Sequence, residues 1–220
     1  MVDPIFIIGG SVAVIGGGIY LAWLYEKKRS EAFQHYAAQH DWTFEKNGHG
    51  RLEEVSHFKL FNQGHGRRLT NVVLGAKDGA FVSIGDYRYT VGSGKSSRTY
   101  NQTVCAVRVP GLDLPHFFAR RQLLLFDDLG RLFGGQDLNF DEDPEFSKAY
   151  VLQTQGNEAR VRQYFNQRAR NAFTELARKS PQVEGHGEAL LLHFGKRLGV
   201  DELDGLVADA VNLVRCWPRG

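Results

Sequence analysis

A glycine-rich stretch with a lysine, Gly92-Ser93-Gly94-Lys95-Ser96, is the part of this sequence closest to a phosphate-binding loop. Such loops follow the pattern Gly-x4-Gly-Lys-Ser/Thr and open a helix whose first amides hold phosphate. The first glycine of the pattern would fall at position 89, which is Tyr89, and the residues that follow the stretch have the composition of a strand. The stretch therefore predicts a solvated hairpin loop and not a nucleotide site.

An acidic run, Asp137-Leu138-Asn139-Phe140-Asp141-Glu142-Asp143, places oxygen ligands at alternate positions, as calcium-binding loops do. A calcium loop also needs glycine at its sixth position and a bidentate glutamate at its twelfth. These positions hold Glu142 and Lys148. We expect an acidic surface turn closed by Pro144.

Histidine side chains could supply metal ligands or a general base. They are His35, His40, His49, His57, His65, His116, His186 and His193. No two histidines have the His-x3-His spacing of a metal site on a helix, none pairs with a nearby cysteine, and no Gly-x-Ser-x-Gly nucleophile turn occurs in the sequence. We therefore assign no catalytic, cofactor-binding or metal-ligating residue, and we expect no bound cofactor.

The most concentrated mixture of charged and aromatic residues is Asp86-Tyr87-Arg88-Tyr89-Thr90. Side chains alternate between the two faces of a strand, so Tyr87 and Tyr89 share one face while Asp86, Arg88 and Thr90 share the other. The pattern favours aromatic core packing opposite a charged outer face. That outer face, with Asp86 and Arg88, is a candidate recognition surface.

These residues follow an N-terminal stretch, residues 4–25, that contains no charged side chain. As a helix it is about 33 Å long, which is enough to cross a hydrocarbon core of roughly 30 Å. Tyr20, Trp23 and Tyr25 gather at one end, as aromatic side chains do at headgroup level. The stretch predicts a transmembrane helix and not a cleaved leader, because no basic residue precedes it.

Lys27, Lys28 and Arg29 directly follow this stretch. Basic residues collect on the cytoplasmic side of membrane helices, so the sequence predicts an outside N-terminus and a cytoplasmic C-terminal domain. Gly9, Ala13 and Gly17 are four residues apart and share one helix face, which is the geometry of close packing between membrane helices. We expect this face to bind a second copy of the helix or a membrane-protein partner.

The remaining residues, 30–220, are predicted to form one soluble domain, after an anchor and basic flank at 1–29. The formal net charge is +2 and basic residues are interspersed with acidic ones, so we expect no nucleic-acid partner. Two cysteines, Cys105 and Cys216, are too few for a secreted disulfide scaffold; a reduced compartment is favoured, although a bond between the two stays open.

Alternation and turn signals predict an antiparallel meander of three strands at 68–76, 80–91 and 98–109. Lys77-Asp78-Gly79 is the first hairpin turn. Further strands are expected at 121–126, 148–154 and 188–194, with helical turns at 127–133, a helix from Asn157 to Leu176 and a closing helix from Asp201. The fold class is therefore α+β, with an N-terminal transmembrane helix followed by a β-meander and packed helices.

Four motifs carry a resemblance: Lys27-Lys28-Arg29, Asp86-Tyr87-Arg88-Tyr89, Gly92-Ser93-Gly94-Lys95 and Asp143-Pro144-Glu145-Phe146. In this order they resemble a group of uncharacterised bacterial proteins with a single membrane-spanning anchor. The resemblance implies a place in the bacterial inner membrane and brings no activity with it.

These features favour an accessory or scaffold protein over an enzyme. The anchor would sit in the bilayer as part of an inner-membrane complex, and the cytoplasmic domain would bind a protein partner. Two alternatives stay open. One is a membrane-tethered enzyme, such as a hydrolase, with a site built from dispersed His, Asp and Glu residues. The other is a sensor of a small ligand.

Overall fold

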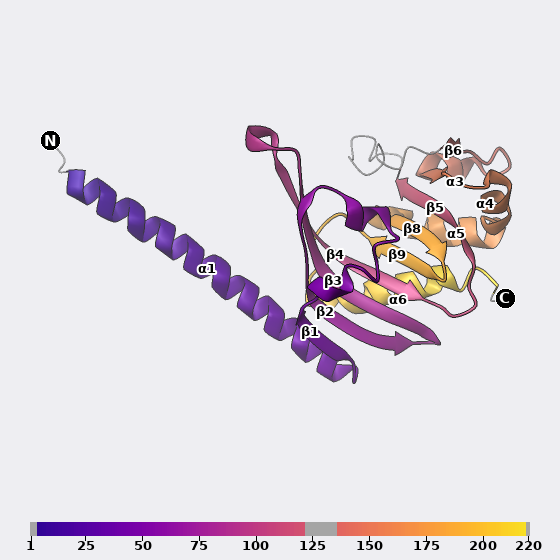
Figure 1. Ribbon diagram of the computed structural model, residues 1–220. Helices are drawn as coiled ribbons and strands as arrows, with labels where there is room; N and C mark the ends of the chain where they lie inside the picture. The colour runs from indigo at the N-terminus through magenta and orange to yellow at the C-terminus, as the bar shows by residue number, and fades with distance from the viewer. Residues whose placement is uncertain (1–3, 122–135, 219–220) are drawn as a thin grey trace.

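The computed structural model describes residues 4–121 and 136–218, with the side chains of residues 4–16 and 136 excepted. A long helix projects from a domain built on one sheet (Figure 1). The helices are α1 (Pro4–Gln39), α3 (Pro144–Ala149), α4 (Glu158–Tyr164), α5 (Gln167–Leu176) and α6 (Leu203–Val214). The strands are β1 (Thr43–Asn47), β2 (His65–Lys77), β3 (Ala80–Val91), β4 (Arg98–Arg108), β5 (Leu114–Arg121), β6 (Gln136–Leu138), β7 (Tyr150–Thr154), β8 (Gln182–Gly187) and β9 (Ala189–His193).

The nine strands form one antiparallel sheet in the order β1-β2-β3-β4-β9-β8-β5-β7-β6. The β2–β3 turn has Asp78 at φ 55° and Gly79 at φ 79°. Positive φ at both central residues is the geometry of the tight hairpin turn that the Asp-Gly pair predicts. The β3–β4 hairpin is longer, and its far end stands clear of the rest of the sheet (Figure 1).

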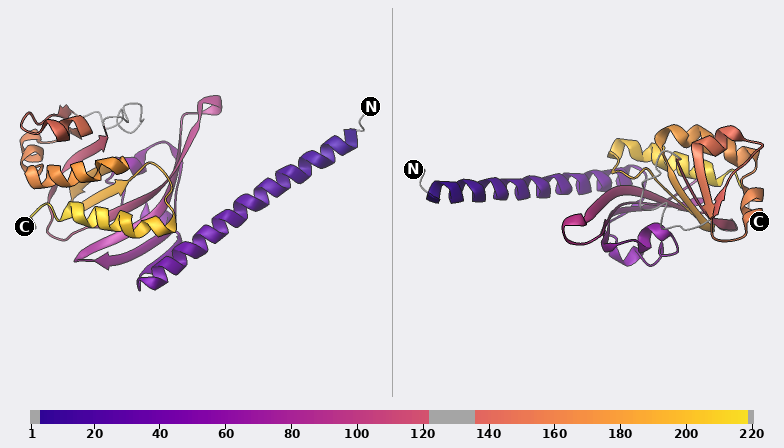
Figure 2. Two further views of the ribbon diagram at one scale, coloured as in Figure 1. Left: turned by 180° about the vertical axis from the view of Figure 1, so that it is seen from behind. Right: turned by 90° about the horizontal axis from the view of Figure 1, so that it is seen from above.

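Both faces of the sheet are covered. The C-terminal part of α1 and helices α5 and α6 lie on one face, and the connecting segment 48–64 lies on the other (Figure 2). On the helical face, Phe33 of α1 and Leu206 of α6 join the main buried cluster. On the opposite face a second buried cluster contains Phe58, Leu60, Phe61, Leu69, Val72, Tyr87, Tyr89, Val104, Phe118, Ala189 and Leu191. Burial on both faces fixes the register of the central strands.

The α+β class and the three-stranded meander are confirmed, with β3 at the predicted bounds. The expected strand at 148–154 begins only at Tyr150, because Asp143 caps α3 and residues 144–149 are helical. The single helix expected from Asn157 is two helices, since the Asn166 side chain caps a new helix, α5. Strands β5 and β8 are not among the predicted strands. The strand predicted at 121–126 and the helical turns predicted at 127–133 lie outside the described residues, except for Arg121, which ends β5.

Among the described residues, no helix combines the length and the apolarity that crossing a membrane requires. Cys105 and Cys216 are both buried, and each is a free thiol. Burial raises the pKa of the Cys105 thiol to about 12, so this side chain is a small apolar core residue.

Candidate functional site

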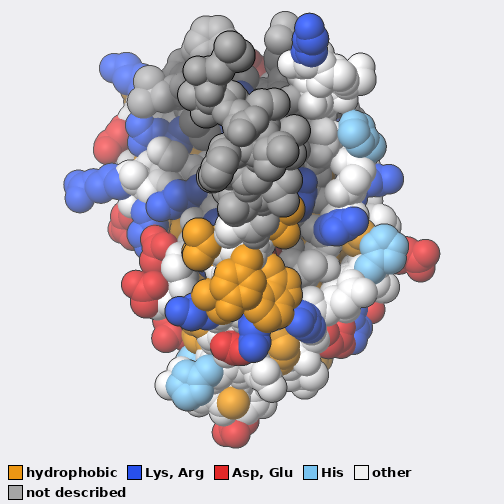
Figure 3. Space-filling view, turned by 90° about the vertical axis from the view of Figure 1, so that its left-hand side faces the viewer, with side chains coloured by type: hydrophobic (Ala, Val, Ile, Leu, Met, Phe, Trp, Pro, Cys, Tyr) orange, Lys and Arg blue, Asp and Glu red, His pale blue; other side chains and the backbone are white. Residues whose placement is uncertain are grey.

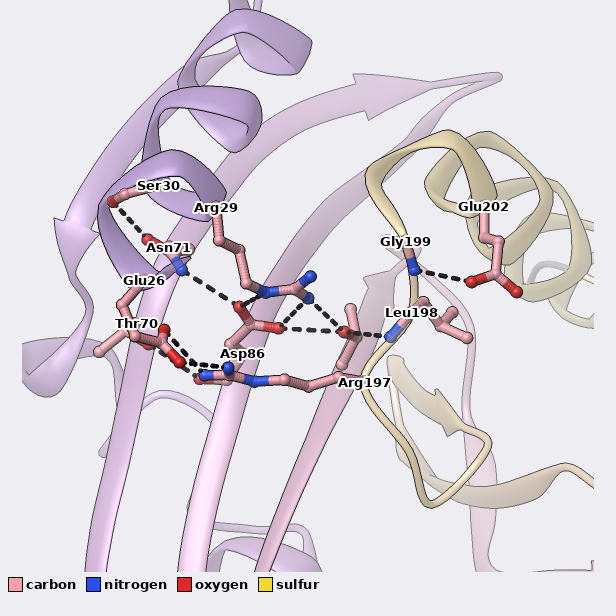
Figure 4. A network of polar contacts seen from close by, with 11 residues as sticks. Glu26, Arg29, Ser30, Thr70, Asn71, Asp86, Arg197, Leu198, Gly199 and Glu202 are labelled. Atoms are coloured by element: carbon pink, nitrogen blue, oxygen red, sulfur yellow. Dashed lines mark hydrogen bonds and ion pairs between the residues drawn. The ribbon is translucent and has the colours of Figure 1, made fainter. Parts of the chain in front are cut away.

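The junction between α1 and the sheet is built on a buried ion pair. Arg29 Nε lies 2.6 Å from Asp86 Oδ2, and Arg29 Nη2 lies 2.7 Å from Asp86 Oδ1 (Figure 4). The Arg29 and Asp86 side chains are 8% and 2% exposed. A two-point contact between guanidinium and carboxylate fixes both distance and direction. The pair therefore holds α1 at a defined angle on the sheet.

Neighbouring polar groups satisfy the remaining hydrogen-bonding capacity of Asp86. The Thr103 hydroxyl donates to Asp86 Oδ1 at 3.0 Å, and the Asn71 amide donates to Asp86 Oδ2 at 3.1 Å. Ser30, the next residue on α1, donates to the Asn71 side chain at 2.7 Å. Thr103 also accepts from the Leu198 backbone amide at 3.0 Å, which ties the loop before α6 into the same network.

Local backbone geometry explains why these side chains meet. The β2–β3 register shifts between Thr70 and Val73, which marks a bulge, and Asn71 in that bulge has φ 53°. Asparagine tolerates this left-handed conformation better than most residues, and a bulge turns the side chains beside it. Asp86 lies directly opposite Thr103 on β4, so both point toward α1.

The surroundings of Arg29 favour its charged form. Burial by itself lowers the pKa of Arg29, but the hydrogen bonds and the charge of Asp86 outweigh it and raise that pKa. Each charge is stable in this interior only because the other is present. A second ion pair joins Glu26, one turn earlier on α1, to Arg197 (Figure 4). Tyr36 further along α1 donates to Asp204 of α6 at 3.0 Å.

In contrast, residues 17–25 of α1 expose large apolar side chains. The exposed fractions are 67% for Ile19, 65% for Leu21 and 56% for Trp23. The Tyr20 and Trp23 rings stack at 6.0 Å, and Lys27 Nζ lies 5.5 Å from the Trp23 ring centre. An exposed apolar surface next to an aromatic and basic collar is typical of a site that meets a membrane or a partner protein.

The structure separates the predicted basic flank. Lys27 and Lys28 are exposed, whereas Arg29 is buried against the sheet. The prediction that Asp86 lies on an outer recognition face is wrong, because α1 covers Asp86 and pairs with it. Arg88, the other residue of that prediction, is exposed.

Gly9, Ala13 and Gly17 all belong to α1, so their spacing places them on one face of this helix. The side chains at Gly9 and Ala13 lie outside the described residues. A Cβ added at Gly17 would meet nothing within 4 Å. The predicted packing face is therefore open at Gly17.

The two loop motifs have structural roles. Residues 92–97 form the expected hairpin end between β3 and β4. Asp143, the last residue of the acidic run, accepts from the Phe146 amide at 3.1 Å and pairs with Arg170 at 2.9 Å. It is thus a helix cap.

A histidine cluster lies on the opposite face of the sheet. The ring centres of His116 and His186 are 4.9 Å apart, and those of His57 and His186 are 5.8 Å apart. His116 Nε2 lies 2.9 Å from Oε1 of the buried Glu184, which also accepts from the Lys59 amide. Burial, and then the nearby His186, lower the pKa of His57. Within the described parts of the chain, no three His, Cys, Asp or Glu residues are arranged to hold a metal ion.

Next to His57 is a mainly apolar groove of about 270 Å³. Val55, Leu74 and Ala106 contribute to its lining, and Phe81 at its edge is 51% exposed. The sequence alone indicates neither the cluster nor the groove, because their residues come from separate segments of the chain that only the fold brings together. The Gly-His-Gly run at 185–187 has the composition of a loop, but it is part of β8.

Comparisons with known proteins give one structural likeness and nothing by sequence. No protein-family model and no curated protein matches this chain. The crystal structure of the mycobacterial trehalose monomycolate transport factor A, TtfA, is similar, with a TM-score of 0.58 over 87% of this chain and 97% of that chain. The two sequences are 14% identical, so the likeness concerns the fold.

Proposed function

We propose that this chain is an accessory protein of a bacterial inner-membrane complex, with α1 as a single-pass anchor and the α+β domain as a cytoplasmic platform for a protein partner. The observation that carries the proposal is the division of α1. Its C-terminal end is locked to the sheet by Arg29 and Asp86, while residues 17–25 leave the domain and expose apolar side chains. The uncharged sequence of residues 4–25 supplies the length for a membrane helix.

Continuity of the helix matters for this role. Because α1 runs without interruption from Pro4 to Gln39, a change in the position of its membrane part is transmitted to the sheet without a flexible linker. The domain can therefore report or impose the orientation of a membrane partner. The shared fold with a protein named as a transport factor supports an accessory role of this kind, in transport.

The test is to express the full chain in bacteria and follow it through membrane extraction. We expect it to stay with the membrane in alkaline carbonate and to leave with a partner, or as a self-associated complex, in mild detergent. Release by carbonate would refute the anchor. A lone monomer in native mass analysis of the detergent extract would refute the accessory role.

Two adjacent glycines provide a matched pair of variants. Gly17→Ile fills the predicted packing face, and Gly18→Ile adds the same bulk about 100° away on the helix. Neither new Cβ would meet another atom within 4 Å, so the domain is undisturbed in both. We expect Gly17→Ile alone to reduce the recovery of partner, with carbonate resistance unchanged in both variants.

A sensor of a small ligand is the second candidate, favoured by the groove beside Phe81, whose lining includes His57 of the histidine cluster. Pockets for small molecules are concave and mostly apolar with a few polar groups, as this groove is. Native mass analysis of the freshly purified chain distinguishes the two candidates. A sensor of this kind retains a small molecule through purification, and Phe81→Ala should weaken the binding of that molecule.

A further inference from the structure

The far half of the β3–β4 hairpin and its neighbour β2 carry a concentration of positive charge. Between residues 55 and 112 the chain has eight Lys and Arg residues, and its acidic residues there are Asp78 and Asp86. Both acids have basic partners from elsewhere in the chain. Asp78 pairs with Arg215 at 3.0 Å, and Asp86 pairs with Arg29. Arg108, at the other end of β4, also has an acidic partner, Glu188, at 3.3 Å. The uncompensated positive charge therefore lies toward the hairpin end.

Two of these basic residues face each other. Arg68 of β2 and Arg88 of β3 are directly opposed in the antiparallel register, so their side chains project from the same face about 5 Å apart at Cβ. Both are exposed, and neither has an ion-pair or hydrogen-bond partner within the described residues. Like charges in this arrangement repel, and a bound anion would relieve the repulsion.

The location of this face points to the kind of anion. Arg68 and Arg88 project from the same face of the sheet as Asp86, which α1 covers. They lie two residues further toward the end of the β3–β4 hairpin, where they are exposed, as is Lys95 at that end. The hairpin end and the N-terminal half of α1 project from the same side of the domain (Figures 1 and 2). Seen from that side, Lys and Arg side chains lie on both sides of the helix base, around exposed hydrophobic side chains (Figure 3).

We propose that Arg68, Arg88 and Lys95, here called the cationic hairpin face, bind the anionic phospholipid headgroups of the bilayer that holds α1. The inference rests on the proposed membrane anchor. It gives the domain a second point of contact beside the helix, which fixes its rotation about the helix axis. The helix α1 holds the domain at the bilayer, and the cationic hairpin face determines which side of the domain faces the cytoplasm.

Electrostatics set the expected strength. A Lys or Arg close to an anionic membrane surface improves binding about fivefold, so the two arginines together are worth on the order of 30-fold. The electrostatic attraction between the arginines and the membrane surface decays within a Debye length of about 8 Å at physiological salt. It should therefore require both anionic lipid and moderate ionic strength.

The experiment uses the full chain with Ser96→Cys, labelled with a fluorophore and reconstituted into vesicles that carry a nitroxide quencher on their headgroups. Ser96 is exposed at the hairpin end, whereas the two native cysteines are buried, so labelling is selective. We expect strong quenching in vesicles of phosphatidylcholine with one third phosphatidylglycerol, and weak quenching in phosphatidylcholine alone. High salt should remove the difference.

Arg68→Gln/Arg88→Gln is the test variant, and Lys148→Gln/Arg168→Gln is its control. The control removes two exposed charges from α3 and α5, on the opposite side of the domain from the projecting helix (Figure 1). We expect the test variant to weaken the contact about 30-fold and the control to leave it unchanged. Equal quenching in the two kinds of vesicle, or equal quenching by the two variants, would overturn the proposal; an acidic protein partner would then be the better occupant.

Carbonate extraction of the same vesicles separates this inference from the anchor on which it rests. If the protein resists carbonate but shows no lipid-dependent quenching, the cationic hairpin face fails and the anchor stands. If carbonate releases the protein and lipid-dependent quenching persists before extraction, the cationic hairpin face is supported and the transmembrane anchor fails.

Discussion

Asp86 and Arg88 lie two residues apart on the same face of β3 and meet opposite environments. Asp86 is 2% exposed, with Arg29, Asn71 and Thr103 around it, so its charge is matched and its oxygens are hydrogen-bonded. Arg88 is exposed and opposes a second arginine. A matched buried charge holds structure together, whereas an unmatched exposed pair of like charges costs stability and suits the binding of an outside partner.

The largest effect is expected at Asp86. Asp86→Asn leaves the buried Arg29 guanidinium without a counter-charge, so we expect a loss of about 3–5 kcal/mol in the free energy of unfolding. Urea denaturation of the full chain in detergent measures it. The double variant Arg29→Met/Asp86→Leu removes both charges and should lose less than the single variant. A loss below about 1 kcal/mol in the single variant would mean that α1 is not held by this pair.

For β3, the sequence predicts which face each side chain lies on, but it does not predict what covers that face. Alternation correctly separated Tyr87 and Tyr89 from Asp86 and Arg88, because face assignment depends only on strand period. Alternation does not tell what covers a face. The partner of Asp86 is 57 residues earlier in the chain, at a position that the sequence assigns to a membrane flank.

Other errors have local causes. Asn166 is a preferred capping residue and caps α5, but the apolar spacing continues on both sides of it and so predicts one continuous helix. Strand β8 is not predicted because it has no apolar alternation: Val183 is its one apolar side chain, next to Glu184 and two glycines. Glu184 is buried there through its bonds with His116 and the Lys59 amide, and these contacts are set by tertiary structure.

His193 is a buried titratable group of the same sheet, and burial is the cause of its pKa shift. Burial lowers the pKa of folded His193 to about 3, whereas the unfolded imidazole has a pKa near 6.5. Between these values the unfolded chain binds a proton that the native chain does not. The stability from neutral His193 is therefore complete above pH 6.5 and lost as the pH falls toward 3.

The free energy of unfolding should fall by about 1.4 kcal/mol per pH unit below pH 6.5, which amounts to a loss of roughly 2 kcal/mol at pH 5. Urea denaturation at pH 7, 6 and 5 measures it, with His193→Gln as the comparison. The variant should lose this part of the pH dependence and keep the rest. If the free energy of unfolding has the same pH dependence in the native chain and in the variant, the prediction is wrong. His193 would then be protonated within the folded protein, next to a counter-charge like the one that Asp86 provides for Arg29.

The smallest effect is expected at Arg88. Arg88→Gln relieves the repulsion from Arg68 and should raise the free energy of unfolding by about 0.2–0.5 kcal/mol in low salt. Adding 1 M salt should remove the gain, because a Debye length of about 3 Å screens the pair. Lys148→Gln, at an exposed site in α3, should show no such gain. If Arg88→Gln instead lowers stability at both salt concentrations, Arg88 serves the fold as Asp86 does, and the repulsion that motivates an anionic partner is absent.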